Sequence, residues 1–451
     1  MEYRSSLLII AICMAAFAGP APFAYADKVK LLVTDQTRLQ THFEVVDQAT
    51  ETLDVSFAFF HDDAVSRAFL NKLVEASGRG VKVRFLLDGL NNALPRELVA
   101  YLVHNKIEVR LYHYISLNPK TWSAKVSWIW KRMHDKQVLA DGWRLIAGTE
   151  NMGGPYYKTL VTPSKANKKG FRGRNILIEG TSAAFSRDYF DTVWKSPDVM
   201  KPPYSLELTP EQWAAQDDLL AEAVTRLVNF PILPVQEPIW QTQDVTQPTT
   251  APGLTPIAGE EFDVDAESIR FVSKLGDLEG GTGGLEHTII EMIKSAKTRI
   301  IIETPYLLLS PDFAKLLIYK ATHDKVEITI YTNSRDSNNH PTGNPLYQAA
   351  AHAIAKTLGI TVKEWSGTET LHGKTVIVDH DQVLVSSFNF NLRSLEHDSE
   401  SGVYMRSQQA TAAVENDLQV NRFSRLGQPG FVVKCGLKFL ENLLLPTKSQ
   451  W

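Results

Sequence analysis

Two stretches of the sequence carry the same reactive residues at the same spacing. "MHDKQVLAD" (133–141) and "LHGKTVIVD" (371–379) each contain a histidine, a lysine two positions later and an aspartate five positions after the lysine. Residues two apart in a β-strand share a face, so each histidine should point the same way as its lysine. Because imidazole titrates near neutral pH, a histidine beside a fixed cation is suited to nucleophilic attack or proton transfer on a bound anion.

Each motif runs into a second apolar segment, "WRLIAG" or "QVLVSS", that ends close to an asparagine. A tight hairpin would fold this segment back antiparallel to the motif strand. We predict two-residue loops at Gly142–Trp143 and His380–Asp381, which place an asparagine opposite each histidine. The predicted pairs are His134 with Asn151 and His372 with Asn389.

The motif aspartates, Asp141 and Asp379, differ from the histidines in their position on the strand. Each lies seven residues after its histidine, on the opposite parity and at the strand end. Alternate residues of a strand point to opposite faces. We therefore expect both aspartates to hold a turn and to take no part in the chemistry.

The two groups of side chains together are suited to a phosphate guest. Fixed cations and amide donors stabilise the charge that develops on phosphoryl oxygens, and two histidines allow one to attack while the other acts as general acid and then base. The candidate catalytic residues are His134, Lys136, His372 and Lys374, and the candidate phosphate-binding residues are Asn151, Asn389, Thr149 and Ser387. No His, Asp and Glu cluster has metal-site spacing, so we expect neither a metal nor another cofactor.

The predicted strands and helices also occur in the same order twice. In the first half, strands at 29–33, 53–60, 81–89 and 107–114 alternate with helices near 38–50, 64–80 and 96–106; in the second half, strands at 268–274, 299–308, 326–334 and 360–366 alternate with helices at 285–297, 311–323 and 345–359. Such alternation indicates βαβ units. We predict an α/β fold of two pseudo-repeated lobes, each a mainly parallel sheet flanked by helices on both faces.

The lobes are expected at residues 27–200 and 263–451, the second ending in a C-terminal helix. Residues 201–262 should form a helix that starts at Thr209 and Pro210, followed by a proline-rich linker.

Residues 1–26 have the pattern of an export signal. An apolar run, "SLLIIAICMAAFA", is of signal length but short for a membrane span, and "AYA" (24–26) offers a small-residue cleavage site. Removal of this segment would take Cys13 and leave Cys435 alone, so no disulfide framework is expected. We expect an exported protein, periplasmic or secreted, either free or peripheral to a membrane.

The motifs resemble the signature of the phospholipase D superfamily, HxKxxxxD followed by G-[ST]-x-N. Residues 134–151 match it fully, and residues 372–389 match it with Ser386 in place of the usual glycine. "PYLLLSP" (305–311) and "NFNLRS" (389–394) are similar to segments of the bacterial cardiolipin synthase branch. The resemblance covers nearly all of the chain after residue 26. It implies a phospholipase D-like fold, a phosphohistidine intermediate and a phospholipid substrate at a membrane surface.

The resemblance also implies individual roles. In relatives the first-motif histidine is usually the nucleophile, here His134, and His372 would protonate the leaving alcohol. Glu400 matches a carboxylate that orients a catalytic imidazole. Where the first half should carry its own carboxylate, this chain has Asn175. An amide can orient His134 but cannot stabilise its charged form, so the roles of the two histidines could be reversed.

The expected reaction is phosphatidyl transfer that makes cardiolipin, or hydrolysis of a phospholipid to phosphatidic acid. The sequence does not separate these two, nor does it name the headgroup and acceptor. A phospholipase D-type nuclease and a secreted phospholipase effector remain alternatives. The chain has 451 residues and a net charge of −4, which argues against a nucleic-acid partner. The oligomeric state is not set by the sequence, and a monomer is compatible with it.

Overall fold

The structure is a computed structural model. It describes residues 26–114, 131–161, 170–228, 261–275, 284–339, 344–358, 360–419 and 423–425. The predicted export signal, apart from Ala26, lies outside the described residues, and so do the proline-rich linker and the predicted C-terminal helix.

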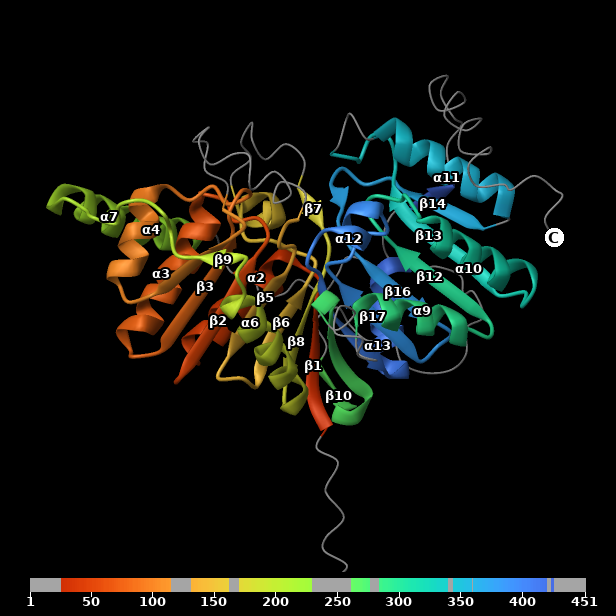
Figure 1. Cartoon of the computed structure of the whole chain (residues 1–451), viewed down its shortest axis with the longest axis horizontal. Helices are drawn as coiled ribbons and strands as arrows, with labels where there is room; N and C mark the ends of the chain where they lie inside the picture. Colours follow the sequence, from red (N-terminus) through yellow and green to blue (C-terminus); the bar gives the residue numbers. More distant parts are fainter. Residues whose placement is uncertain are drawn as a thin grey trace, which may run out of the picture.

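The described residues form two large sheets that stand side by side (Figure 1). The first sheet has, in spatial order, β10 (Glu261–Asp265), β1 (Ala26–Leu32), β8 (Asn175–Glu179), β6 (Arg144–Gly148), β5 (Lys136–Ala140), β2 (Thr52–Phe57), β3 (Lys82–Asp88), β4 (Glu108–Tyr112) and β9 (Val199–Met200). The second has β11 (Ile269–Ser273), β18 (Ser401–Arg406), β17 (Gln382–Ser386), β16 (Thr375–Val378), β12 (Arg299–Glu303), β13 (Glu327–Asn333), β14 (Thr361–Trp365) and β19 (Phe423–Arg425).

The two sheets repeat one strand order. The series β1-β8-β6-β5-β2-β3-β4 in the first corresponds to β11-β18-β17-β16-β12-β13-β14 in the second. The predicted α/β class and the duplication into two lobes are thereby confirmed. Within the two large sheets, parallel pairing is limited to β2-β3-β4 and β12-β13-β14, and the other pairings between the described strands are antiparallel. The sheets are therefore mixed, not mainly parallel. The reason is that the two strands of each motif hairpin add to the parallel strands by antiparallel pairing.

Helices cover the outer face of each sheet. In the first lobe these are α2 (Asp35–Asp47), α3 (Ala64–Gly78) and α4 (Arg96–His104), with α7 (Pro210–Val228) packed against α3 and α4; in the second they are α9 (Leu285–Ser295), α10 (Pro311–Thr322) and α11 (Asn344–Leu358). The predicted start of α7 is confirmed by a capping box, in which Thr209 and Gln212 each accept a hydrogen bond from the backbone N–H of the other, at 2.9 and 3.2 Å.

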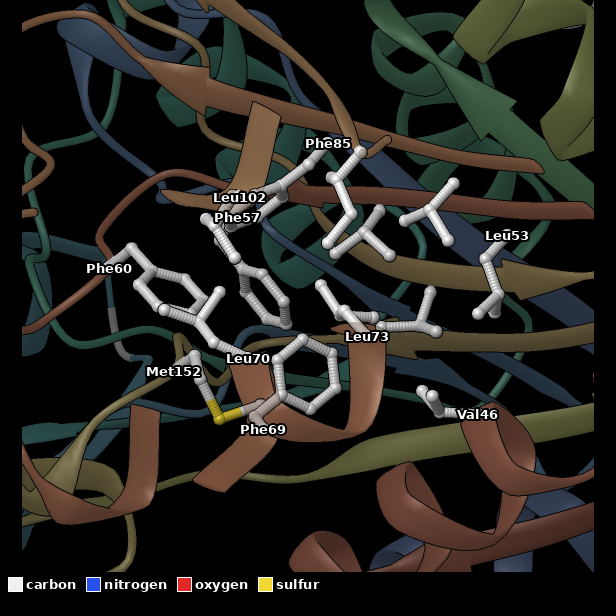
Figure 2. Close-up of a cluster of buried hydrophobic side chains, with 14 of the residues drawn as sticks. Val46, Leu53, Phe57, Phe60, Phe69, Leu70, Leu73, Phe85, Leu102 and Met152 are labelled. Carbon is white, nitrogen blue, oxygen red and sulfur yellow. The ribbon is translucent and has the colours of Figure 1, made fainter. Parts of the chain in front are cut away.

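The core beneath α2, α3 and α4 is rich in aromatic rings. Figure 2 shows Phe57 and Phe60 from the end of β2 and the residues after it, Phe69 from α3, and Met152 at the margin of the cluster. Phe57, Phe60 and Phe69 make edge or tilted contacts with centroids 5.8 to 6.4 Å apart. Fixed aromatic packing of this kind holds the end of β2, which borders the first motif.

One strand crosses the predicted lobe boundary at residue 262. Strand β10 pairs antiparallel with β1 at the edge of the first sheet, whereas β11, which follows after a single turn, belongs to the second sheet. The turn between β10 and β11 therefore carries the chain from the first sheet to the second. Figure 1 shows β10 lying beside β1.

The inner faces of the two sheets pack against each other. One buried apolar cluster contains Leu145 and Ile178 of the first sheet together with Val383 and Val403 of the second. Helices α6 (Phe185–Lys195) and α13 (Gln408–Gln419) cover other parts of these inner faces. Burial of apolar surface thus joins the lobes into one body.

A buried arginine also crosses the interface. Arg174, just before β8 in the first lobe, donates to Glu303 and Asp417 of the second lobe and to the Thr375 hydroxyl, the last at 2.6 Å. The Arg174 side chain is 2% exposed, and the two carboxylates are 0% and 5% exposed. Removing one member of such a network leaves buried charge without compensation, which is costly.

We predict that Arg174→Met lowers the free energy of unfolding by about 3–5 kcal/mol, because Glu303 would remain buried without its cation and Asp417, which also pairs with Arg172, would lose part of its compensation. Urea unfolding followed by circular dichroism measures this. The matched control is Arg226→Met, which removes an exposed pair with Glu222 on α7 and should cost less than about 0.5 kcal/mol. Equal losses for the two variants would contradict the role given to Arg174.

Candidate active site

Each motif histidine is held at its backbone by the opposite lobe. The N–H of His134 donates to the Ser399 carbonyl at 3.0 Å, and the Ser399 N–H donates to the Arg132 carbonyl at 2.9 Å. The N–H of His372 donates to the Arg172 carbonyl at 2.6 Å. This second contact extends a small parallel sheet of β7 (Phe171–Arg172) and β15 (Thr370–Leu371) between the lobes. The structure brings both motifs to one place, and neither lobe alone holds its own histidine.

Each motif strand turns back through a loop of three residues. Ala140 pairs with Arg144, and Val378 pairs with Gln382. The predicted two-residue loops are therefore wrong by one residue. The reason is that Asp141 adopts a left-handed conformation with φ 50°, as does Asp379 with φ 51°, which lengthens the turn.

The carboxylates of these aspartates fix the turns to the neighbouring strand. Asp141 accepts hydrogen bonds from the N–H groups of Thr50, Glu51 and Thr52 at 2.7 to 2.9 Å. Asp379 accepts from the N–H groups of residues 297–299 at 2.8 to 3.2 Å. Burial alone would raise the pKa of each aspartate, but these hydrogen bonds lower it below its ordinary value. The expected turn-holding role is confirmed.

The two motif lysines are buried and similarly anchored. Lys136 Nζ donates to the carbonyl of His134, and Lys374 Nζ donates to the carbonyl of His372 at 2.7 Å. An ammonium has three N–H donors, so each lysine keeps donors for a ligand. Burial lowers the pKa of Lys136 to about 8. Burial, together with the nearby charge of Lys136, lowers the pKa of Lys374 to about 7.

The His134 ring is firmly oriented. Its Nδ1 lies 2.8 Å from Glu400 Oε2 and 3.0 Å from the Ser387 carbonyl. Both oxygens accept, so Nδ1 carries the proton and Nε2 is left with a lone pair. Burial, and then the charge of Lys136, lower the pKa of His134 well below its ordinary value. The imidazole is thus neutral and suited to act as a nucleophile at neutral pH.

Asn175 does not lie behind His134. Its Oδ1 accepts hydrogen bonds from the N–H groups of Thr149 and Glu150 at 3.1 and 3.2 Å. The expectation that it orients His134 is wrong, because Glu400 of the other lobe occupies that position. Asn175 instead fixes the backbone where β6 ends.

Two of the predicted phosphate ligands are engaged elsewhere. The Thr149 hydroxyl donates to the Arg174 carbonyl at 3.0 Å, and the Ser387 hydroxyl donates to the Glu400 carboxylate. A hydroxyl has one proton to donate. These two side chains therefore hold the site together in this structure, and they do not present donors to a phosphate.

The two predicted asparagines differ in their surroundings. Asn151 Oδ1 accepts from the Phe59 N–H at 2.9 Å, and its Nδ2 donates to the Tyr156 hydroxyl at 2.9 Å. Met152, the next residue, enters the aromatic core shown in Figure 2. Asn389 Oδ1 is buried and has no hydrogen-bond partner within the described part of the chain. Each amide still has an N–H available, so phosphate binding by both asparagines stays a prediction.

His372 lies among side chains that the sequence patterns did not single out. The rings of Tyr156 and Phe171 lie 5.5 and 5.1 Å from the His372 ring, centroid to centroid. The nearest carboxylate is Glu150, whose Oε2 lies 3.8 Å from His372 Nδ1. Glu150 occupies the variable position of "GTEN", and no simple motif marks it.

The site couples several ionisable groups. Burial, then Lys374, Lys136 and His134, lower the pKa of His372 well below its ordinary value. Burial raises the pKa of Glu400 to about 7 and that of Glu150 to about 7, although nearby cations oppose both shifts. An anion entering between the two lysines would favour their charged forms. The arrangement can therefore bind a phosphoryl group, attack it and move a proton.

Two other features are absent from the described residues. No group of three or more His, Cys, Asp or Glu side chains there is placed to hold a metal ion. No helix in the same residues is long and apolar enough to cross a membrane.

The sequence matches a known protein family. The family described as "Cardiolipin synthase, PLD-like domain" matches residues 43–158 and 289–421, which together make up more than half of the chain and include both motifs. The chain belongs to the phospholipase D superfamily, in its cardiolipin synthase-like branch. The resemblance inferred from the motifs is confirmed.

Individual relatives of this phospholipase D-like chain are distant. It is 24% identical to cardiolipin synthase C of Escherichia coli (strain K12) over 394 residues, which cover 81% of this chain and 78% of the relative. It is 25% identical to cardiolipin synthase A of Pseudomonas syringae pv. syringae (strain B728a) over 215 residues, 46% of this chain and 40% of the relative. The crystal structure of phosphatidylserine synthase from Haemophilus influenzae Rd KW20 shares the fold, with a TM-score of 0.61, 14% identity and coverage of 92% and 93%.

The role of the motif aspartates can be tested at Asp379. We predict that Asp379→Ala lowers the free energy of unfolding by about 1–2 kcal/mol, as loss of a helix cap does, because several N–H groups lose their acceptor. The turnover number of the folded variant should stay within about twofold of the wild type. Asp379→Asn, which keeps one acceptor oxygen and tolerates a positive φ, should lose less stability. A large loss of turnover at unchanged stability would assign Asp379 to the chemistry.

Proposed function

We propose that the protein is a phospholipid phosphodiesterase and phosphatidyltransferase of the phospholipase D type, acting through a phosphohistidine. The observation that carries this proposal is one buried site in which two neutral histidines and two lysines come from both lobes, with His134 held by Glu400. Membership of the phospholipase D superfamily supports the same reaction class.

In the first half-reaction, His134 is the nucleophile. Its Nε2 attacks phosphorus, so an N–P bond forms as the bond from phosphorus to the leaving alcohol oxygen breaks. That oxygen takes a proton from His372. This histidine must therefore be protonated when the anionic substrate is bound, and the negative charge of the substrate favours the protonated form. Lys136 and Lys374 stabilise the charge on the phosphoryl oxygens. The firm orientation of His134, compared with His372, favours this assignment over the reverse.

The second half-reaction runs the same steps backwards with a different oxygen. An acceptor hydroxyl gives its proton to neutral His372, its oxygen bonds to phosphorus, and the N–P bond to His134 breaks. Water as acceptor yields phosphatidic acid. The hydroxyl of a phosphatidylglycerol yields cardiolipin, which is the outcome that the names of the relatives favour.

A lipid substrate is supported by apolar side chains near the site. Among the described residues, Phe59, Leu90, Leu346 and Leu392 are large, apolar and 37%, 49%, 47% and 41% exposed. Phe59 and Leu90 follow β2 and β3, and Leu346 and Leu392 begin α11 and α12 (Leu392–Glu396). All four belong to segments at the edge of the sheets where the motif histidines lie. Apolar side chains placed so are suited to contact with acyl chains or a membrane surface.

The signal-like residues 1–26 support action outside the cytoplasm, at the surface of a membrane that the enzyme meets after export. This address is part of the proposal.

The reaction can be tested with the purified chain from residue 27 and vesicles of phosphatidylglycerol or phosphatidylethanolamine, without added metal. We predict phosphatidic acid or cardiolipin as product, and phosphatidylglycerol from phosphatidylethanolamine when glycerol is added as acceptor. His134→Ala and His372→Ala should each reduce turnover by about 10³-fold or more, because each removes an essential group of one shared site. Thin-layer chromatography of the lipids gives the readout.

The control is His287→Ala, which changes an exposed histidine of α9 and should leave turnover unchanged. Cleavage of DNA or of a phosphodiester dye with no conversion of lipid would point to the nuclease instead. Substantial turnover in either His134→Ala or His372→Ala would contradict a site built from both motifs.

A further inference from the structure

The repeated strand pairing shows which residue of the first lobe corresponds to Glu400. In the second lobe β17 and β18 pair Ser386 with Gly402, and in the first β6 and β8 pair Gly148 with Asn175. Glu400 lies two residues before Gly402. Its counterpart two residues before Asn175 is Gly173, which has no side chain to place behind a histidine.

The space at Gly173 is filled from the opposite strand. A Cβ added to Gly173 would collide with Glu150 Oε1 and with the Thr149 hydroxyl. Gly173 does not have a positive φ, so its backbone would accept a side chain and only these neighbours exclude one. The carboxylate of Glu150 therefore occupies the space that a side chain at position 173 would enter.

Glu150 and His372 both have buried polar atoms that lack a well-formed hydrogen bond. The Glu150 side chain is fully buried, and neither of its oxygens has a hydrogen-bond partner within the described residues. In the same residues His372 Nδ1 makes no well-formed hydrogen bond either, although the backbone of Thr149 faces the ring and favours its charged form, which raises its pKa against the larger effect of burial. A buried polar group without a partner is costly, and these two lie 3.8 Å apart. A movement of less than about 1 Å would close a hydrogen bond between them.

We propose that Glu150 is the positioning carboxylate of His372, taking the place that Glu400 has behind His134. It holds the proton on His372 Nδ1, turns Nε2 toward the phosphoryl group and stabilises the imidazolium that forms during turnover. Each histidine would thus have a carboxylate behind it, but from a different strand of the repeat. Glu400 comes just before β18, whereas Glu150 comes just after β6, the counterpart of β17. This inference rests on the proposed function for its kinetic test and on the geometry alone for its spectroscopic test.

The groups that face this pair come from several elements. Arg38 and Asp35 of α2 act on Glu150, as do Lys374 and Lys136. Lys374, Lys136 and His134 act on His372. Since these lysines oppose a charged imidazole, an adjacent carboxylate is the group that can stabilise it.

The kinetic test compares Glu150→Gln with the wild type. The amide keeps the shape but not the charge, so we expect kcat to fall about 10- to 100-fold, as for other groups that orient a catalytic imidazole, with little change in KM. Removing the carboxylate lowers the pKa of His372, so the limb of the pH–rate profile that reports His372 should move to lower pH. Glu400→Gln, acting on His134, should move the other limb. An unchanged kcat and unchanged limbs in Glu150→Gln would overturn the proposal.

The spectroscopic test does not depend on turnover. In protein labelled with ¹⁵N-histidine, the His372 signals are assigned by their absence in His372→Ala. We expect the wild type to show a single tautomer with the proton on Nδ1, and Glu150→Gln to show a changed tautomer ratio and a lower His372 pKa. An identical tautomer and titration in the two proteins would overturn the inference. A wild type that shows this tautomer but converts no phospholipid would sink the proposed function alone.

A position swap separates orientation from simple packing. The background for the swap combines Glu150→Ala with Thr149→Ala, which removes both side chains that a Cβ at position 173 would meet. This background should lose activity, and adding Gly173→Glu should restore it by at least about tenfold, because the cleared space allows the carboxylate to enter from the strand used by the second lobe. Gly173→Glu in the wild-type background, where the space is filled, should instead destabilise the fold. A folded triple variant that stays as inactive as the background with alanine at positions 149 and 150 would contradict the proposal.

Discussion

The backbone N–H of each motif histidine donates to a carbonyl of the other lobe, and the remainder of the site depends on this exchange. His134 is tied to Ser399 and His372 to Arg172. The apolar contact between the sheets and the buried Arg174 network keep these short connections in register. Because of this exchange, duplication of the lobe has produced one site with two unequal halves, and not two sites.

The same burial that fixes the geometry disfavours the charged forms of the ionisable groups in the site. Lys136 and Lys374 have lowered pKa values, whereas those of Glu150 and Glu400 are raised, and both histidines are driven toward the neutral form. Placing charges where water cannot reach them is costly to stability. A phosphoryl anion, the ligand that we propose, would favour the charged forms of both lysines, and the charge that develops during the proposed transfer would favour them more strongly.

Local patterns predicted much of this protein, and tertiary contacts decided the remainder. The strand and helix order, the helix start at Thr209 and Pro210 and the turn-holding aspartates follow from periodicity and residue chemistry within short segments. The loop length did not, because the left-handed conformation of Asp141 depends on the three N–H groups that it accepts from. Nor could the sequence show that Glu400 reaches across to His134, since that contact joins residues far apart in the chain.

Trapping the covalent intermediate shows whether both halves form one site with a single nucleophile. Rapid alkaline quenching of enzyme mixed with labelled phospholipid, followed by mass spectrometry of the peptides, gives the amount and position of bound phosphorus. We expect at most one phosphoryl group per chain, carried by His134. Two groups per chain, or labelling of His134 and His372 in independent proportions, would contradict it.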